Sequence, residues 1–473
     1  MPMTAEQAAT VAADLIAAHR RTLQRNGSKG RVQRYLKGDH DLPFMPKGAT
    51  AEFRTLARRS VTNWLPLISD TFTKGLFVDG YRPAKAAQNS KAWDYWQANG
   101  LDARQSVAHR GAIEFGQSFV LVLPGSPAPV IRPLHPLRTF VLFADPDDEY
   151  PAIALVRAGD TADGSALWKI YDAEAEYLIR EPEKGGGIEL VGAPYLHGLG
   201  VTPLVRFRDR LDGEACGVIE PVIAVQDRVN ETVFALMIAL QYASFRQRWA
   251  TGLSIPVDTE PFLSDGVTAN PNFGKPIETF EAAVDRLWIT DNPDARFGDF
   301  AQTEVSGHLE AYLSAVRTLA ALASTSPHVM LGEMSNVSGE ALQAYRDVET
   351  RRGQEFETLF GEAWEQVFRL AGAAAGDAGI AEDESSEVRW RDAEPRAFGA
   401  TIDGLGKMVQ MLGVPAEGAW ARIPGVTDQE IERWKAIRQE GDVMGALLGS
   451  MTTQAAPNPG NAPAATTPAA PTP

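Results

Sequence analysis

Histidine and cysteine are the residue types with which this sequence could bind a metal or attack a substrate. No two of the histidines have the helical spacing of a metal site, and these are His19, His40, His109, His135, His197, His308 and His328. Cys216 is the only cysteine, which excludes an internal disulfide and a zinc site built from several thiolates of one chain. We therefore expect no metal site, and we interpret the histidines as surface or packing residues.

Other catalytic and nucleotide-binding motifs are missing. The segment nearest to a phosphate-binding loop runs from Gly399 to Met408, but Lys407 is displaced and no serine or threonine follows it. The Gly-x-Ser-x-Gly elbow of hydrolases is absent. The acidic run at 382–384 lies in a Gly-, Ala- and Ser-rich connector, which favours a solvated loop. The sequence predicts no enzyme and no cofactor, and only a site assembled from distant residues is left open.

Composition and charge limit the class of protein. The chain has 473 residues, of which 44% are hydrophobic and 22% charged, enough for two or more units with their own cores. The longest apolar run, Val233 to Leu240, is much shorter than the roughly 18–20 residues that cross a bilayer. No membrane span is expected, and residues 1–20 lack the pattern of a signal peptide, which predicts a cytoplasmic protein.

The net charge of −16 bears on nucleic-acid binding. Tight wrapping of DNA depends on cationic side chains that neutralise phosphates, and this chain is acidic. A conduit for DNA needs only weak contacts, so the same charge is compatible with passage of DNA.

The first 210 residues predict a mixed α+β domain. Apolar residues recur at helical spacing over 5–23, 51–72 and 91–116. Alternating apolar patterns bounded by glycine and proline predict strands at 75–82, 118–123, 139–143, 153–157, 167–171 and 176–180.

The second half of the chain is dominated by long helical patterns. Residues 217–248 and 339–370 each predict a helix of 32 residues, about 48 Å long. Between them lie a Pro- and Gly-rich segment at 251–300, a helical pattern at 302–323 and a loop at 324–338. A strand at 387–391 and helices at 400–412 and 428–439 follow. The Ala-, Pro- and Thr-rich residues 451–473 have no apolar periodicity, which predicts disorder.

Short local sequences accompany this order of elements. They are 63–66, 75–82, the Trp93-x-x-Trp96-x-x-Asn99-x-Leu101-Asp102 pattern, 114–120, 200–207, 219–227, 248–252, 338–342 and 388–392. Each taken alone indicates core packing, because buried aromatics and strand-ending glycines need no further role. In this shared order they resemble the portal proteins of long-tailed bacteriophages.

The resemblance implies an α+β portal-protein fold with a mixed α/β wing, long stem helices, a small α/β clip, a tunnel loop and a helical crown. Mapped onto this sequence, the parts are an N-terminal segment at 1–50, the wing at 51–216, a stem helix at 217–250, the clip at 251–301, a second stem helix at 302–324, the tunnel loop at 325–338, a long wing and crown helix at 339–372, a crown-like domain at 373–442 and a disordered tail at 443–473.

The resemblance also implies the function and the partners. Portal proteins form a ring of about twelve copies at one capsid vertex, a closed head-to-tail assembly that the two overlong helices would suit. The ring is a channel for packaging and ejection of double-stranded DNA without sequence specificity. The implied partners are the terminase large subunit, a head-completion or adaptor protein, and the major capsid and scaffolding proteins. The expected location is the virion, after assembly in the host cytoplasm, with no role for a membrane.

The predicted tunnel loop contains the candidate DNA-facing residues, because it joins two long helices at the narrowest turn of such a ring. They are His328, Val329, Met330, Leu331, Glu333 and Met334. The apolar members can slide past phosphates without strong attraction, and the charge of Glu333 repels them. The alternative is that Met330 and Leu331 fold back on the neighbouring subunit.

Two other functions stay open at this point. Another structural or head-completion protein of the virion would usually be much shorter and would not need this order of helices. An acidic cytosolic enzyme with an unrecognised site would run as a monomer or small oligomer and bind a small molecule saturably.

Overall fold

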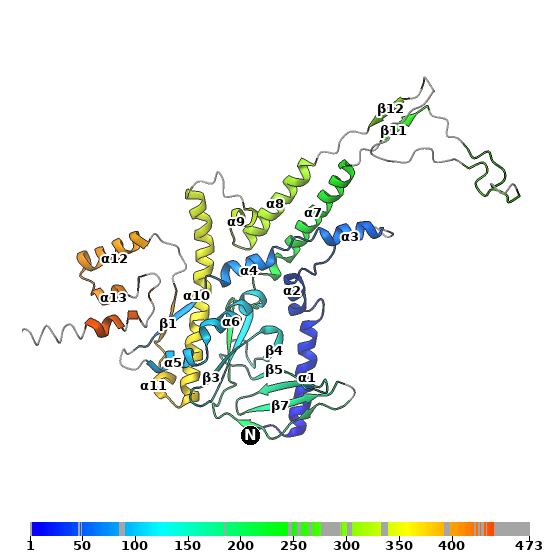
Figure 1. The fold of residues 1–473 in the computed structure, drawn as a ribbon. Helices are drawn as coiled ribbons and strands as arrows, with labels where there is room; N and C mark the ends of the chain where they lie inside the picture. The colour runs from blue at the N-terminus through cyan, green and yellow to red at the C-terminus, as the bar shows by residue number, and fades with distance from the viewer. Residues whose placement is uncertain are drawn as a thin grey trace, which may run out of the picture. The chain divides into compact units, whose positions relative to one another are not determined.

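The computed structural model describes residues 2–45, 48, 50–84, 90–183, 186–244, 248–252, 257–263, 267–275, 294, 296–299, 305–332, 339–391, 398–420, 422–423, 426, 430–431 and 433–438. Helices and strands are both abundant along the chain, which confirms the α+β fold class (Figure 1). The disordered tail predicted at 443–473 lies outside the described residues.

The helices and strands have the following bounds. The helices are α1 (Ala5–Leu23), α2 (Ser28–Leu36), α3 (Ala51–Arg59), α4 (Leu65–Thr73), α5 (Ser90–Ala98), α6 (Leu101–Phe115), η1 (Pro136–Arg138), η2 (Glu220–Val222), α7 (Ile223–Ser244), α8 (Ser306–Leu322), α9 (Pro327–Leu331), α10 (Gly339–Ala375), α11 (Ala378–Ala381), α12 (Phe398–Leu412) and α13 (Ala416–Trp420). The strands are β1 (Val78–Arg82), β2 (Gln117–Leu123), β3 (Val130–Leu134), β4 (Thr139–Leu142), β5 (Ile153–Asp160), β6 (Ala166–Tyr171), β7 (Ala175–Glu181), β8 (Glu189–Leu190), β9 (Tyr195–Leu196), β10 (Leu204–Arg208), β11 (Arg248–Thr251), β12 (Arg296–Asp299) and β13 (Glu387–Trp390).

The chain divides into two compact units that interleave in sequence. Unit 1 comprises residues 1–74, 107–121 and 133–360, and unit 2 comprises 75–106, 122–132 and 361–473. Unit 2 therefore combines residues from the expected wing, 51–216, with residues from the expected crown-like domain, 373–442. The boundary inside 51–216 could not be predicted locally, because it depends on strand pairing between distant residues.

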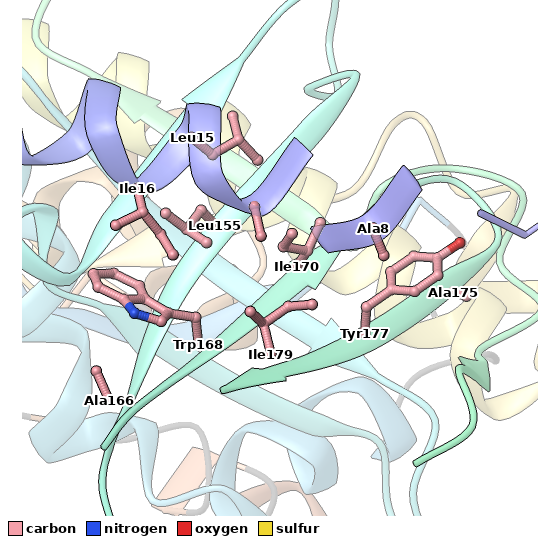
Figure 2. Close-up of a cluster of buried hydrophobic side chains, with 11 residues drawn as sticks. Ala8, Leu15, Ile16, Leu155, Ala166, Trp168, Ile170, Ala175, Tyr177 and Ile179 are labelled. Carbon is pink, nitrogen blue, oxygen red and sulfur yellow. The ribbon is translucent and has the colours of Figure 1, made fainter. Parts of the chain in front are cut away.

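A sheet with the order β4-β5-β6-β7-β8, in which β9 also pairs with β7, forms a core of unit 1. Helix α1 lies on one face of this sheet, where Leu15 and Ile16 contact a cluster that includes Trp168 and Ile170 (Figure 2). The first helix of the N-terminal segment expected at 1–50 therefore completes this core. The small side chain of Ala12 lets the helix approach the sheet closely.

A buried lysine fastens α2 to the segment that begins this sheet. The ammonium group of Lys29 donates to the carbonyl oxygens of Pro136, at 2.8 Å, and of Thr139, at 2.7 Å. Burial lowers the pKa of Lys29 to about 8. Burial and the nearby charge of Lys29 lower the pKa of His19, on α1, to about 4. Lys29 and His19 are therefore both harder to protonate here than in water, because desolvation penalises the charged form of both side chains.

Two glycines bring the chain that precedes α7 close to the end of α6. Gly116 has φ 82°, and a Cβ atom there would lie 2.4 Å from the backbone nitrogen of Cys216. Gly217 has φ 71°, and its Cβ atom would lie 2.6 Å from the carbonyl oxygen of Glu114. Only glycine adopts this conformation at this distance without strain. The segment also contains Pro221, which lies in η2 rather than in the following α-helix.

The long helices differ in extent from the predictions. The helix expected at 217–248 is shorter, because Gly217 turns left-handed and α7 begins only at Ile223, for a length of 22 residues. The helix expected at 339–370 is longer, since α10 has 37 residues and ends before Gly376, which has φ 69°. The helix expected at 302–323 is α8, with residues 302–304 outside the described part.

Two predicted helices are broken in the structure. The pattern at 51–72 forms α3 and α4, because Pro66 begins a new helix at its first turn. The pattern at 91–116 forms α5 and α6, because Gly100 has φ 60° between them. The predicted strands of the first half occur as β1, β2, β4, β5, β6 and β7, each within three residues of its expected bounds.

Unit 2 is held by one strand pair and an aromatic cluster. Strand β1 pairs antiparallel with β13, with Val78 opposite Trp390. The rings of Trp96 and Trp364 have centroids 4.8 Å apart, and Phe368 stacks on Trp96 at 5.9 Å. The Trp93 and Trp96 motif is therefore used for packing, as its spacing indicated. The strand predicted at 387–391 is confirmed as β13, and the helix predicted at 400–412 is confirmed as α12.

Candidate functional site

The predicted tunnel loop contains a short helix. After α8 the chain turns through Ser324, whose φ is 55°, and α9 then runs from Pro327 to Leu331. Ser326 is the extended N-cap residue, Pro327 occupies the first turn, and Gly332, with φ 68°, ends the helix. A serine before a proline and a glycine after the last helical residue are ordinary start and stop signals. The segment that the sequence predicts as a loop therefore carries the start and stop signals of α9.

The structure separates the candidate DNA-facing residues. Val329 is 51% exposed, whereas Met330 is only 5% exposed. His328 and Leu331 are half-buried. Glu333 and Met334 lie outside the described residues. Of the four candidates in the described part, only Val329 presents most of its side chain to solvent.

Met330 lies in the interior of its own subunit. It lines a depression together with Leu67 and Ile68 of α4, which leaves no room for a water molecule. The hydroxyl of Thr325 donates to the Met330 sulfur at 3.5 Å. Methionine fills such irregular gaps because its side chain is unbranched and flexible. The side chain of Met330 therefore anchors α9, and its contact with DNA stays a prediction.

Helix α10 holds the start of α9. The carboxylate of Glu349 accepts a hydrogen bond from the backbone N–H of Ser326 at 2.6 Å. Glu349 and Val329 also line the depression that contains Met330. Side chains from α4 and α10 therefore fix the position of α9. Val329 lies on this fixed helix.

The two helices that lead toward this segment pack side by side (Figure 1). Helix α8 buries a stripe of small and branched side chains, including Val316 and Leu319. Leu240 of α7 and both Leu309 and Leu322 of α8 stay exposed.

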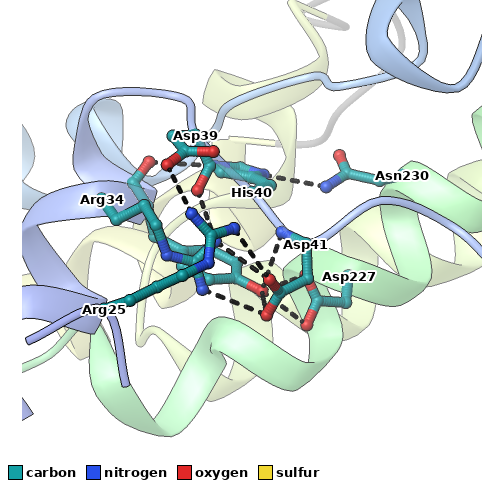
Figure 3. A network of polar contacts seen from close by, with 8 residues as sticks. Arg25, Arg34, Asp39, His40, Asp41, Asp227 and Asn230 are labelled. Atoms are coloured by element: carbon teal, nitrogen blue, oxygen red, sulfur yellow. Dashed lines mark hydrogen bonds and ion pairs between the residues drawn. The ribbon is translucent and has the colours of Figure 1, made fainter. Parts of the chain in front are cut away.

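A polar junction ties α7 to α2 and to the residues that follow it (Figure 3). The hydroxyl of Tyr35 donates to the carboxylate of Asp227, with oxygen distances of 2.7 and 2.9 Å. His40 contacts the carbonyl oxygen of Tyr35 at 2.9 Å through Nε2 and the amide nitrogen of Asn230 at 2.8 Å through Nδ1. The rings of Tyr35 and His40 stack with centroids 4.6 Å apart.

Ion pairs surround this junction on its outer side. The guanidinium of Arg34 donates to the carbonyl oxygen of Asp39 at 2.7 Å and to the carboxylate of Asp41 at 3.1 Å. Arg25 pairs with the same two aspartates at 3.1 and 3.4 Å. The Arg34 side chain also lies over the ring of Tyr35, with 4.8 Å from its carbon Cζ to the ring centroid.

Burial dominates the electrostatics of the junction. It raises the pKa of Asp227 and lowers the pKa of His40, because desolvation disfavours the charged form of each side chain. It also raises the pKa of Tyr35, which additionally donates to Asp227. The sequence pattern gave no indication of this network, since Tyr35 and Asp227 are 192 residues apart.

Two further observations concern membrane-spanning helices and metal sites. Among the helices that it describes, none is long and apolar enough to cross a membrane. Within the described ranges, no group of three or more His, Cys, Asp or Glu residues is arranged to hold a metal ion.

Comparison with known proteins identifies the family. The family model for phage portal proteins of the SPP1 Gp6-like type matches residues 14–443. This match covers most of the sequence, and the chain belongs to this family of structural virion proteins.

Two curated relatives are named portal proteins. The portal protein of Mycobacterium phage D29 is 24% identical over 421 residues, which cover 83% of each chain. The portal protein of Mycobacterium phage L5 is 24% identical over 435 residues, which cover 86% of this chain and 84% of the relative.

Solved structures of gene transfer agent particles also contain similar chains. A chain of the native virion particle matches with a TM-score of 0.41 and 13% identity, over 82% of this chain and 96% of that one. A chain of the neck of the empty particle matches with a TM-score of 0.40 and 12% identity, over 79% of this chain and 92% of that one.

Proposed function

We propose that this chain assembles into a ring of about twelve copies at one vertex of the capsid, and that double-stranded DNA passes through the ring during packaging and ejection. Membership of the portal family carries this proposal. The exposed leucines of α7 and α8 support it, because a ring places the same surface of every copy against its neighbour. In this role the chain is a structural protein and not an enzyme.

The partners follow from the same role. The ring docks the terminase large subunit during packaging and a head-completion or adaptor protein afterwards. The major capsid and scaffolding proteins surround it, and assembly takes place in the host cytoplasm. The chain carries a net charge of −16, which favours weak and transient contact with the DNA backbone.

Val329 is the described residue best placed to touch DNA in this proposal. It is exposed on α9, between α8 and α10. His328 and Leu331 flank this position, and Glu333 and Met334 stay predictions. Met330 contributes by holding α9 in place.

Mass photometry of the purified full chain tests the ring. Twelve copies of the 51.2 kDa chain give a species of about 614 kDa, and negative-stain images should show a central hole. A chain that stays monomeric at micromolar concentration, with no rings in phage particles, would contradict the proposal.

A point substitution at the exposed Val329 tests the DNA contact and leaves the buried Met330 in place. Val329→Glu adds a charge that repels phosphate at the exposed position and should leave ring assembly intact while reducing the DNA retained per particle. Val348→Glu, at an exposed position of α10, is the matched control. Equal DNA retention in Val329→Glu and wild-type particles would remove α9 from the channel wall.

A further inference from the structure

The junction between α2 and α7 contains a histidine that can be accommodated in only one protonation state. We infer that His40 is a proton-sensitive latch, and that its protonation releases α2 and the segment after it from helix α7. The inference concerns a contact inside one subunit and does not depend on the proposed ring.

The orientation of Asn230 fixes the tautomer of His40. The amide oxygen of Asn230 accepts from the backbone N–H of Thr62 at 3.1 Å and from the side-chain amide of Gln226 at 3.0 Å. Its NH₂ group must therefore point at Nδ1 of His40, which is 2.8 Å away. Nδ1 has to accept this hydrogen bond, so the ring proton resides on Nε2 and is donated to the carbonyl oxygen of Tyr35.

A second proton on His40 has no acceptor in this arrangement. It would place an N–H at Nδ1 directly against the NH₂ group of Asn230. Rotating the Asn230 amide would supply an oxygen but would turn the NH₂ group toward Thr62 and Gln226, which both donate at present. Either state leaves buried donors opposed, and His40 is only 3% exposed, so water cannot relieve the conflict.

Asp227 of α7 and Arg34 of α2 are the charged groups that act on His40. Arg31 of α2 and Asp41 act on the carboxylate of Asp227. The ring of Tyr35 stacks on His40, and the side chain of Asn63 also contacts it. The carboxylate of Asp227 favours protonated His40 and Arg34 opposes it, but burial is the largest influence and lowers the pKa of His40. Asp227 is itself held by the hydroxyl of Tyr35, which donates to its carboxylate.

The sign of the pH dependence follows from this lowering. The released state binds a proton at the ordinary histidine pKa of 6.5, whereas the latched state binds it only at lower pH. The latch is therefore fully effective above pH 6.5 and weakens as the pH falls below that value. Between about pH 7.5 and about pH 5.5, proton binding by the released state raises the opening constant by at most about tenfold.

Amide hydrogen exchange of the full-length chain, read by mass spectrometry, measures this opening locally. Exchange at each pH is divided by the intrinsic rate of an unstructured reference peptide. Peptides from α2 and from the first half of α7 should exchange several-fold faster, up to about tenfold, at pH 5.5 than at pH 7.5. A local readout is needed because His19, whose pKa is also lowered, makes global unfolding acid-sensitive too.

The variant His40→Gln tests whether protonation of His40 causes the pH dependence of exchange. Glutamine supplies one donor and one acceptor without titrating, so corrected exchange should be the same at both pH values. His308→Gln, on α8, is the matched control and should keep the wild-type pH dependence. The latch is refuted if wild-type exchange at these peptides does not change with pH, or if His40→Gln keeps the full change.

Asn230→Asp provides a second variant with the opposite expectation. A carboxylate at this position still accepts from Thr62 and Gln226 and can also accept from protonated Nδ1. The junction should then be tighter at pH 5.5 than at pH 7.5, which reverses the wild-type order. Wild-type behaviour of a folded Asn230→Asp chain would overturn the inference even if His40→Gln did not fold.

Discussion

Two regions fasten the N-terminal helices α1 and α2 to the rest of unit 1, and they do so by different physical means. Helix α1 is held by an apolar cluster in which Leu15 and Ile16 contact the sheet. Helix α2 is held by polar atoms, through Tyr35 and His40 to Asp227 and Asn230 of α7. The two helices follow one another directly in the chain, so the difference lies in the chemistry of the two contacts.

The difference determines how each contact responds to conditions. Apolar burial is non-directional and depends on neither pH nor moderate salt. A buried polar network stabilises one geometry only, and it loses that advantage when one donor or acceptor changes its proton. We therefore expect the apolar contact of Leu15 and Ile16 to be independent of pH, whereas His19 on α1 and the contact between α2 and α7 respond to acid.

The largest effect is expected from the apolar region. Ile16→Ala removes a buried side chain and should lower the free energy of unfolding by about 2–5 kcal/mol, as is typical of such cavities. Urea unfolding checks this value at two pH values, and the loss should be the same at both. Asp14→Ala, on the exposed side of α1, is the control and should change stability by less than about 0.5 kcal/mol.

Lys29 should give a pH effect of the same sign as that of His40, but at higher pH. Its pKa is about 8 in the folded chain and 10.5 in the unfolded chain, so the unfolded state holds the proton over this interval. Raising the pH from 8 to 10.5 should therefore increase stability, by on the order of 2–3 kcal/mol. The neutral amine still has two N–H groups for the carbonyls of Pro136 and Thr139.

Comparison of the wild type with Lys29→Met isolates this contribution from other groups that titrate at high pH. The rise measured by urea unfolding should disappear in Lys29→Met and persist in Lys74→Met, whose side chain is exposed. An unchanged rise in Lys29→Met would show that Lys29 is not desolvated.

Tyr35→Phe should weaken the polar contact between α2 and α7 and lower the free energy of unfolding moderately. It removes the donor to the carboxylate of Asp227, and this half-buried acceptor without its partner should cost about 1 kcal/mol, the low end of the range for buried groups. The loss should be smaller at acidic pH, because burial raises the pKa of Asp227 and protonation removes the unpaired charge. A double-mutant cycle with Asp227→Asn measures the coupling, and Tyr195→Phe at an exposed position is the control.

The sequence predicted elements whose signals are local. The helix expected at 5–23 coincides with α1, because Thr4 caps it and its apolar residues recur at helical spacing. The strands around Trp168 were predicted from simple alternation. Helix α9 was missed although its signals were present, because five residues are too few for an apolar periodicity to emerge.

The candidate site and the polar junction were less predictable for a different reason. Burial of Met330 depends on α4, which is remote in sequence, and the same side chain would suit a flexible exposed loop. The partners of Tyr35 depend on the docking of α2 against α7. Charged and polar residues at these positions read as surface residues, because sequence alone does not show which of them become buried.

The smallest expected loss of stability is that of Arg25→Ala, at the exposed edge of the polar junction. Arg25 and Arg34 both pair with Asp41, but the Arg25 side chain is 59% exposed and the Arg34 side chain only 6% exposed. Water screens the Arg25 pairs, whose acidic partners are also exposed, so Arg25→Ala should cost less than about 0.5 kcal/mol.

This small loss should vanish at about 0.5 M salt, where screening extends over only a few ångströms. Urea unfolding at low and high sodium chloride concentration measures this loss of stability. Arg21→Ala, on α1, is the control. Arg34 donates to a backbone carbonyl and lies over Tyr35, so Arg34→Ala should remain costly at high salt. If Arg25→Ala cost more than about 1 kcal/mol at high salt, the buried junction would extend beyond Arg34, and Arg25 would belong to it rather than to its solvated rim.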